Sequence, residues 1–202
     1  HACETSCSYL ISLLMWAPLT FGETLSILDI AALSVVAIQD IKGRTHCTGF
    51  VIDAEEDYIQ TALHCITEVD KRDWAIMVDG KAARLVSVNS EFDLAVLRAE
   101  TDKPQLRPTT RAIKKGLKIT SIGHAAGLKL LTFAESEVIH AGKRVVMVRH
   151  QTNGMSGGPI IDEDGNVIAI VQFGVTLKDG TLADSGASIG VMLALEGRFW
   201  RR

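Results

Sequence analysis

The sequence predicts an all-β domain, arranged as a sandwich or as a pair of barrels, and three observations support this. Short runs rich in Val and Ile recur along the chain, turn signals such as Asp79-Gly80 and Asp164-Gly165 separate them, and few segments have a helical pattern. The chain has 202 residues, enough for one domain with a substantial buried core. Its net charge of −3 and scattered basic residues argue against a nucleic-acid partner.

Twelve strands are expected, and each is a short run dominated by apolar and β-branched residues. In chain order they are residues 33–39, 48–53, 57–62, 74–78, 84–88, 93–98, 118–123, 131–139, 144–149, 159–161, 167–173 and 187–193. A polar stretch, 99–116, interrupts the series after the sixth strand and contains Pro104 and Pro108. The series therefore divides into two groups of six.

The segment from Gly154 to Pro159 is the most informative motif. It places Ser156 among glycines, which let backbone N–H groups turn towards one point where an oxyanion could sit. A serine hydroxyl is a poor nucleophile unless a neighbouring base takes its proton. His64, in Ala62-Leu63-His64-Cys65, is a candidate base, and Asp93, at the start of an apolar run, is a candidate carboxylate to fix the tautomer of the histidine.

The order of these residues separates three kinds of hydrolase. Gly154-x-Ser156-x-Gly158 also fits the nucleophile elbow of an α/β-hydrolase, but that fold needs a histidine after the serine, and residues 157–202 contain none. The subtilisin order needs an aspartate before the histidine. The candidates for this aspartate are Asp40, Asp53 and Asp57. None of them lies in so apolar a strand-like run as Asp93 does. The order His64, Asp93, Ser156 is that of chymotrypsin.

On these motifs the chain resembles the chymotrypsin-fold serine peptidases. The runs Gly49-Phe50-Val51-Ile52-Asp53, Ile122 to Gly127 and Ile160 to Ile170 are most similar to the bacterial HtrA-type branch. The resemblance covers about residues 31–200. HtrA-type enzymes usually carry a peptide-binding domain after the protease; because the sequence ends at Arg202, regulation by such a domain is not expected.

The resemblance implies two six-stranded antiparallel β-barrels with the active site in the cleft between them. The first barrel would span about 31–100, the linker about 99–116 and the second barrel about 117–195, all within a protease domain of 23–202. It implies a serine endopeptidase that acts on a polypeptide through His64, Asp93 and Ser156, with the N–H groups of Gly154 and Ser156 as the oxyanion hole. No cofactor is implied.

Substrate-binding residues follow from the same resemblance. The strand Val171-Gln172-Phe173-Gly174 would pair an extended substrate and line the pocket. His150 occupies the position that forms the base of the pocket in the resembled family, where a specificity role and a structural role are both open. With Val171 on the pocket wall, an uncharged, small to medium apolar side chain before the cut is expected.

One feature of trypsin-type zymogens is missing. An aspartate before the serine pairs with a freed N-terminal amine in those proteins, but Met155 holds this position here. We expect Met155 to pack against the second barrel and no such activation to operate. The other histidines, His46, His124 and His140, are expected to be surface or structural residues.

The cysteines allow three interpretations: a disulfide, free thiols or a metal site. His46-Cys47 and His64-Cys65 together form a Cys₂His₂ set, but the spacing is unlike that of zinc sites. Neighbouring residues on a strand also point to opposite faces, so each pair would struggle to converge on one ion, and no metal is expected. The resembled trypsin-type enzymes bridge the positions of Cys47 and Cys65, which implies a disulfide and an oxidising compartment.

The N-terminal segment suggests export. Residues 9–21 carry no charge and are too few to span a bilayer comfortably, so no stable membrane span is expected. They fit the apolar core of a signal peptide cleaved after Gly22, which makes 1–22 a leader and the protein periplasmic or extracellular. A basic region and an initiator Met are missing from this pattern, and a core-packing helix is the alternative. Cys3 and Cys7 would leave with the leader.

Three function classes remain open. The first is a serine endopeptidase. The second is an idle protease fold used for binding, against which the intact set of three residues argues. The third is a virus-encoded polyprotein protease, which has the same chemistry. The sequence does not specify the oligomeric state.

Overall fold

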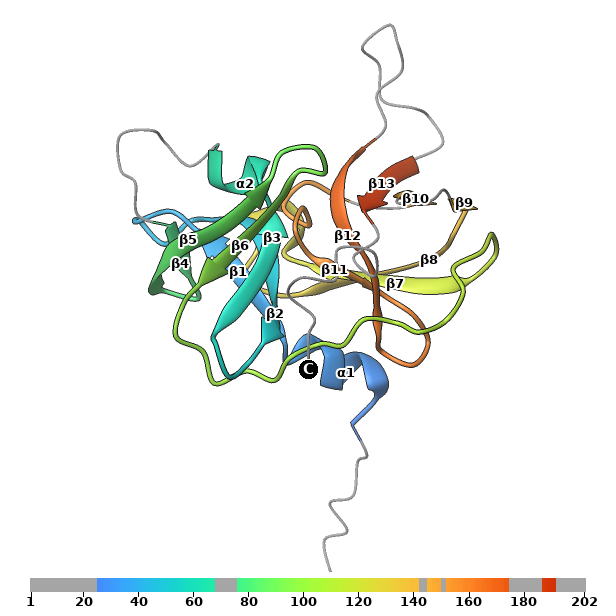
Figure 1. Cartoon of the computed structure of the whole chain (residues 1–202), viewed down its shortest axis with the longest axis horizontal. Helices are drawn as coiled ribbons and strands as arrows, with labels where there is room; N and C mark the ends of the chain where they lie inside the picture. The colour runs from blue at the N-terminus through green and yellow to red at the C-terminus, as the bar shows by residue number, and fades with distance from the viewer. Residues whose placement is uncertain (1–24, 68–75, 142–144, 150–151, 175–186, 192–202) are drawn as a thin grey trace, which may run out of the picture.

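The computed structural model describes residues 25–67, 76–141, 145–149, 152–174 and 187–191. Six of its strands close into a barrel, in the order β1-β2-β3-β6-β5-β4, and all of their pairings are antiparallel. Their bounds are Val35–Gln39 (β1), Thr45–Asp53 (β2), Tyr58–Ala62 (β3), Ile76–Val78 (β4), Lys81–Asn89 (β5) and Leu94–Arg98 (β6). Figure 1 shows this first barrel as the blue and green half of the molecule.

The other seven strands form one sheet in the order β8-β7-β11-β12-β13-β10-β9. Their bounds are Lys118–Gly123 (β7), Thr132–Glu137 (β8), His140–Ala141 (β9), Val145–Arg149 (β10), Pro159–Ile161 (β11), Val167–Gly174 (β12) and Ala187–Val191 (β13). The expectation of two six-stranded barrels is thus confirmed in part, since the first barrel is closed and has six strands. Within the described residues the second half is one seven-stranded sheet with β8 and β9 at its two edges, and the short strand β9, which pairs with β10, is the strand beyond the expected six.

Each expected strand overlaps an observed one, and the sequence analysis missed the helical segments and the short strand β9. Helix α1 (Ile27–Ala32) begins at Ser26, whose hydroxyl accepts from the Asp29 N–H while the Asp29 carboxylate accepts from the Ser26 N–H. The Ser26 hydroxyl also donates to the Asp29 carboxylate at 2.7 Å, and this bond, followed by the one from the Ser26 N–H, lowers the pKa of Asp29. The other helical segments in the described residues are α2 (His64–Thr67) and the 3₁₀ turn η1 (Ala125–Gly127). None of the helices in the described residues is long and apolar enough to cross a membrane.

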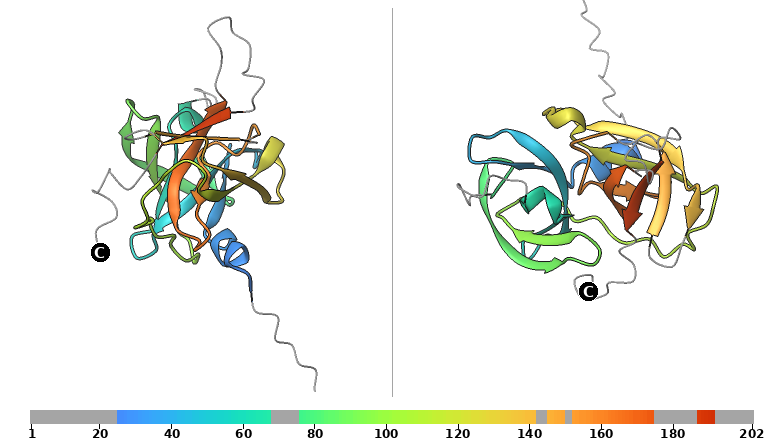
Figure 2. Two further views of the ribbon diagram at one scale, coloured as in Figure 1. Left: turned by 90° about the vertical axis from the view of Figure 1, so that its right-hand side faces the viewer. Right: turned by 90° about the horizontal axis from the view of Figure 1, so that it is seen from above.

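The two halves share one apolar cluster. Phe50 on β2, Ile122 on β7 and Ile170 on β12 are fully buried in it, and Ala31 of α1 packs there as well. Each half also has a core of its own, around Ile38 and Leu97 in the barrel and around Ile160 and Ile168 in the sheet. The views in Figure 2 show the halves side by side. The shared core fixes the orientation of one half relative to the other.

The segment between the halves follows both of them. The Leu106 N–H donates to the Val51 carbonyl of the barrel, 3.0 Å away, and the Thr109 N–H donates to the Val167 carbonyl of the sheet, 2.8 Å away. Leu106 is also buried in the shared core. This segment thus holds the halves together rather than looping freely between them.

Candidate active site

His64 and Asp93 meet because two neighbouring strands of the barrel place them side by side. Strand β3 ends just before His64 and β6 begins just after Asp93, and the two strands pair with Ala62 opposite Leu94. The Leu63 N–H then donates to the Asp93 carbonyl, 2.9 Å away. Asp93 has a φ of 53°, in the left-handed region that aspartate tolerates better than most residues. The backbone of the barrel itself therefore brings the two residues together.

The Asp93 carboxylate makes two hydrogen bonds to His64. One oxygen accepts from the His64 backbone N–H at 2.8 Å, and the other lies 2.5 Å from Nδ1 of the ring. The exposed fractions of the His64 and Asp93 side chains are 26% and 21%, so the ring is accessible from outside the protein. A carboxylate at Nδ1 favours the tautomer with the proton on Nδ1, which leaves the lone pair on Nε2.

Two glycines shape the serine loop, which we define as Gly154 to Pro159. Gly154 and Gly157 have φ values of 90° and 82°, which L side chains rarely adopt. A Cβ on Gly154 would overlap the His124 carbonyl, and one on Gly157 would overlap the Thr48 carbonyl. These positions accept only glycine, both for conformation and for space.

Thr48, a fully buried residue on β2, holds the serine loop from the first barrel. Its N–H donates to the Ser156 carbonyl at 2.9 Å and its hydroxyl donates to the Gly154 carbonyl at 2.8 Å. The same hydroxyl accepts from the His124 N–H, also at 2.8 Å. Sequence reasoning missed Thr48, since a bond across the two halves leaves no local pattern.

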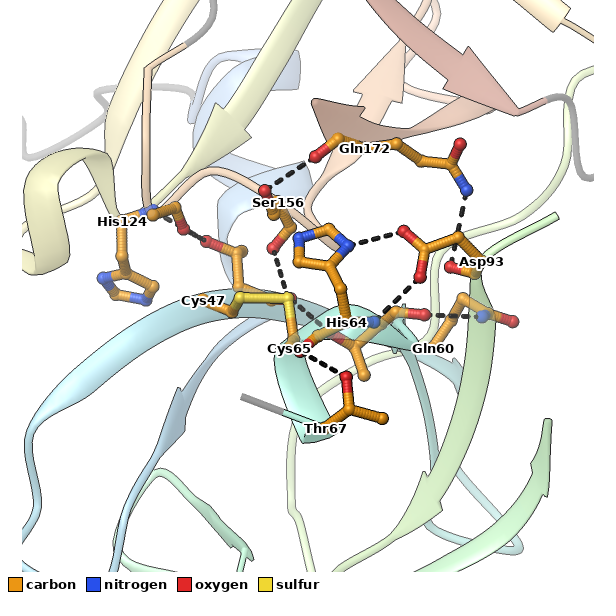
Figure 3. The surroundings of a disulfide bond; sticks show 12 residues. Cys47, Gln60, His64, Cys65, Thr67, Asp93, His124, Ser156 and Gln172 are labelled. Carbon is orange, nitrogen blue, oxygen red and sulfur yellow. Dashed lines mark hydrogen bonds and ion pairs between the residues drawn. A yellow bond between two sulfur atoms is a disulfide. The ribbon is translucent and has the colours of Figure 1, made fainter. Parts of the chain in front are cut away.

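Ser156 lies next to the segment that carries His64. The Sγ of Cys65, the residue after His64, is 3.6 Å from the Ser156 carbonyl oxygen, and Figure 3 shows the side chains of Ser156 and His64 close together. The Ser156 hydroxyl donates to the Gln172 carbonyl at 2.7 Å. The structure thus brings His64, Asp93 and Ser156 into one site.

The backbone before Ser156 has a defined orientation. The Asn153 carbonyl accepts from the Ala126 N–H at 2.6 Å. The described chain contains no cis peptide bonds, so the Gly154 N–H points away from that carbonyl and from the turn η1. Among the described residues, no acceptor is found for the N–H of Gly154 or of Ser156. Two such donors in a glycine-rich loop are the groups that an oxyanion hole needs.

Gln172 is buried. It is the extra residue of a bulge in β12, because Val171 and Phe173 pair with consecutive residues of β13. Its side-chain amide donates to the carbonyl of Phe92 and, at 3.4 Å, to that of Asp93. Figure 3 shows this amide reaching across to the aspartate segment. One residue of the second sheet therefore contacts both the Ser156 hydroxyl and the backbone that carries Asp93.

The remaining predicted residues of the pocket are only partly described. Val171 is 2% exposed and packs in the core of the second sheet. Phe173 and Gly174 lie on β12, and His150 lies outside the described residues. The leader 1–22 and the cysteines within it also lie outside.

Two expectations about neighbouring residues are confirmed. Met155 is fully buried and packs with Ile119 and Ile160 of the second sheet. His124 is structural: it is 6% exposed, its Nδ1 is 2.9 Å from the Leu128 carbonyl, and burial lowers the pKa of its ring.

The structure joins Cys47 and Cys65 in a disulfide, with their Cα atoms 5.9 Å apart. Cys47 lies on β2 and Cys65 on α2, so the bridge ties the helix that begins with His64 to the strand that carries Thr48. Figure 3 shows the bridge beside the His64 ring. His46 does not join them; its Nε2 is 3.4 Å from the Asp40 carboxylate.

Comparison with known proteins agrees with this fold. Residues 47–170 match the trypsin-like peptidase domain family, and the match covers more than half of the chain. The chain therefore belongs to the trypsin-like peptidase family and is a serine endopeptidase. No curated protein sequence matches this chain.

Three solved structures share the fold. The active form of the Rv3671c protease from M. tuberculosis is 22% identical with a TM-score of 0.68, covering 83% of this chain and 79% of that one. The serine endoprotease from Yersinia pestis is 22% identical with a TM-score of 0.69, covering 86% and 64%. The HtrA-type protease AlgW, solved with a decapeptide, is 20% identical with a TM-score of 0.67, covering 84% and 64%.

Proposed function

We propose that this serine endopeptidase cleaves peptide bonds through His64, Asp93 and Ser156 and an acyl-enzyme intermediate. The observation that carries the proposal is the bond of 2.5 Å between Nδ1 of His64 and the Asp93 carboxylate, in a site that also contains Ser156. That bond presents Nε2 as the base. The seven-stranded sheet has the role of the second barrel, and the site lies between the halves.

The reaction has two stages. Nε2 of His64 takes the proton of the Ser156 hydroxyl as Oγ forms a bond to the substrate carbonyl carbon. The imidazolium then gives that proton to the leaving amine as the peptide C–N bond breaks. In the second stage water takes the place of the Ser156 hydroxyl: it gives a proton to His64 as it attacks the acyl carbon, and the acid is released as His64 returns the proton to Ser156. The N–H groups of Gly154 and Ser156 stabilise the oxyanion in each stage.

The resting hydroxyl must turn before it reacts. The Ser156 Oγ donates to the Gln172 carbonyl, and Gln172 lies on β12, the strand proposed to pair with an extended substrate. A backbone N–H of the bound peptide would compete for the same carbonyl. Substrate binding would thereby release the hydroxyl towards His64.

A fluorophosphonate probe tests the function directly, because it reacts only with an activated serine. The wild-type protein should be labelled on Ser156 and should hydrolyse a fluorogenic peptide, whereas Ser156→Ala should lose both and keep its circular dichroism spectrum. kcat/KM should rise with pH through roughly 6–7.5 as His64 becomes neutral. An unlabelled wild-type protein would favour an idle, peptide-binding fold.

The substrate class and location are further parts of the proposal. The strand from Val171 to Gly174, proposed to bind the substrate, would favour an uncharged, small to medium apolar side chain before the cut. A peptide-library digest tests this: dominant cleavage after Arg or Lys contradicts it, and cleavage after Gln or Glu that is lost in His150→Ala assigns the recognition to His150. We also propose export, which the disulfide between Cys47 and Cys65 supports.

A further inference from the structure

Cys47, His64 and Cys65 form a compact set of metal-ligating groups beside the proposed catalytic base. One ligand atom from each residue lies within 4.8 Å of those of the others. The cysteines are 4% and 1% exposed, so the sulfurs are buried, and the His64 ring is the accessible member. Figure 3 shows the ring next to the sulfur pair, with the nitrogen that bonds Asp93 on its far side.

The local backbone explains why the sequence argument against such a set fails at His64 and Cys65. That argument assumed neighbouring residues on a strand, whose side chains point to opposite faces. These two residues instead begin the helix α2, where neighbouring side chains are not opposed. The assumption holds for His46, which lies on β2 and turns to Asp40.

The chemistry of the set is that of zinc once the disulfide is reduced. Two thiolates and one imidazole are the protein ligands of a known class of zinc site with an open fourth position. Two sulfurs on one tetrahedral zinc ion lie roughly 3.8 Å apart, from Zn–S distances of about 2.3 Å. The Cα separation of 5.9 Å between Cys47 and Cys65 can accommodate that spacing through side-chain rotation.

The surroundings complete the site. Asp93 bonds Nδ1 of His64, so Nε2 is the nitrogen that would bind the ion. A carboxylate on the second nitrogen of a metal-bound histidine fixes the ring and makes it a better ligand. Two thiolates balance the charge of one Zn²⁺, so the ion adds no net charge to this buried position.

We propose that the reduced protein binds Zn²⁺ through the sulfurs of Cys47 and Cys65 and Nε2 of His64, and that the bound ion stops proteolysis. A dithiol reductant converts the disulfide to two thiols and is itself oxidised to its disulfide; the thiols then release two protons as zinc binds. The ion occupies the lone pair that takes the serine proton, so the inhibition, unlike the binding, rests on the proposed function. The oxidised protein has no thiolates to offer and stays active.

Cobalt binding tests the site independently of activity. The protein is reduced with a dithiol, freed of it by gel filtration without oxygen, and titrated with Co²⁺. We expect one ion per chain, with a near-ultraviolet thiolate-to-cobalt absorption band that Zn²⁺ abolishes. The oxidised protein should show no band.

With the fluorogenic peptide, one equivalent of Zn²⁺ should lower the activity of the reduced protein more than tenfold and that of the oxidised protein less than twofold, reversibly with a chelator.

Variants separate the ligands from their surroundings. Cys47→Ser and Cys65→Ser should each lose the band, and Asp93→Asn should weaken Co²⁺ binding about 10–100-fold. His46→Ala, beside Cys47 but outside the set, is the matched control and should bind as the wild type does. A band that persists in Cys65→Ser, equal inhibition of both redox forms, or loss of the native circular dichroism on reduction would overturn the proposal. A normal band in a protein with no peptidase activity would retain the metal site and reject the proposed function.

Discussion

His64 and Asp93 are positioned from within the first barrel, whereas Ser156 is positioned by groups from both halves. The pairing of β3 with β6 and the bond from the Leu63 N–H set the geometry of the base. Ser156 instead depends on Thr48, whose N–H and hydroxyl hold the serine loop across the interface. The base is thus a property of one half, and the nucleophile is a property of how the halves meet.

The dependence also runs in the other direction, through one residue. Gln172 of the second sheet donates its amide to the carbonyls of Phe92 and Asp93, next to the carboxylate that orients His64. Its backbone carbonyl meanwhile accepts the Ser156 hydroxyl. The shared core around Phe50, Ile122 and Ile170 keeps these polar contacts in register. The comparison predicts that a change to the bond between Asp93 and His64 acts on chemistry alone, while changes to the contacts that hold the serine loop across the interface act on chemistry and stability together.

The largest effect should come from Asp93→Asn. The variant can still accept the bond from the His64 N–H, but its amide cannot accept from Nδ1–H, so the ring takes the tautomer with its proton on Nε2. A protonated Nε2 cannot take the serine proton, and kcat should fall about 10⁴-fold. The measurement is turnover of the fluorogenic peptide. Asp40→Asn, which removes a buried carboxylate away from the site, is the control and should keep kcat within about threefold.

The next effect tests the serine loop. Gly157→Ala requires a positive φ and places a Cβ against the Thr48 carbonyl, so we expect a loss of more than about 2 kcal/mol in the free energy of unfolding and almost no activity. Gly43→Ala is the matched control, since Gly43 has a φ of 74° but nothing within 4 Å of the added methyl group. It should cost about 1 kcal/mol and leave kcat unchanged. Equal costs in urea unfolding would show that the interface does not constrain the loop.

The sequence analysis predicted the features that leave a local pattern in the amino-acid sequence. Alternating and apolar runs identified the strands, and chain order selected His64, Asp93 and Ser156 as one set. Helix α2 escaped because four residues are too few for a periodic signal, and helix α1 was missed although its capping residues Ser26 and Asp29 are a pattern typical of a helix start. Thr48 escaped, and Gln172 was predicted only as a substrate-binding residue, because the partners of both side chains lie far away in sequence. The bulge that aims Gln172 at Phe92 likewise depends on the pairing of β12 with β13.

Thr48→Val tests the contact between the halves at a smaller scale. The change keeps the shape of the side chain but removes the hydroxyl bonds to the Gly154 carbonyl and the His124 N–H. Leaving these buried groups unpaired should cost about 1–3 kcal/mol in unfolding. A displaced oxyanion hole should lower kcat about 10- to 100-fold with little change in KM, and Thr48→Ser should restore most of it.

Thr61→Val provides the comparison within the barrel. The Thr61 hydroxyl is fully buried and donates to the Thr48 carbonyl at 2.8 Å, so its loss should cost similar stability. It contacts the serine loop less directly than Thr48 does, and kcat should stay within about threefold. If both variants lowered kcat equally, the hydroxyl of Thr48 would have no special role in holding the loop.

The smallest effect concerns His124, whose backbone N–H donates to the Thr48 hydroxyl at the interface between the halves. Burial lowers the pKa of this histidine from its ordinary value of 6.5, so the unfolded chain binds a proton more readily than the folded one. The contribution to stability is therefore complete above pH 6.5 and declines as the pH falls towards the lower, folded pKa. The slope of unfolding free energy against pH can reach about 1.4 kcal/mol per pH unit for one proton.

His124→Asn keeps a donor for the Leu128 carbonyl but does not titrate, so urea unfolding between pH 5 and 8 should show a shallower slope than the wild type. His140→Asn, which removes an exposed histidine on β9, is the matched control. A slope equally shallow in both variants would place the pH dependence elsewhere than at the interface between the halves.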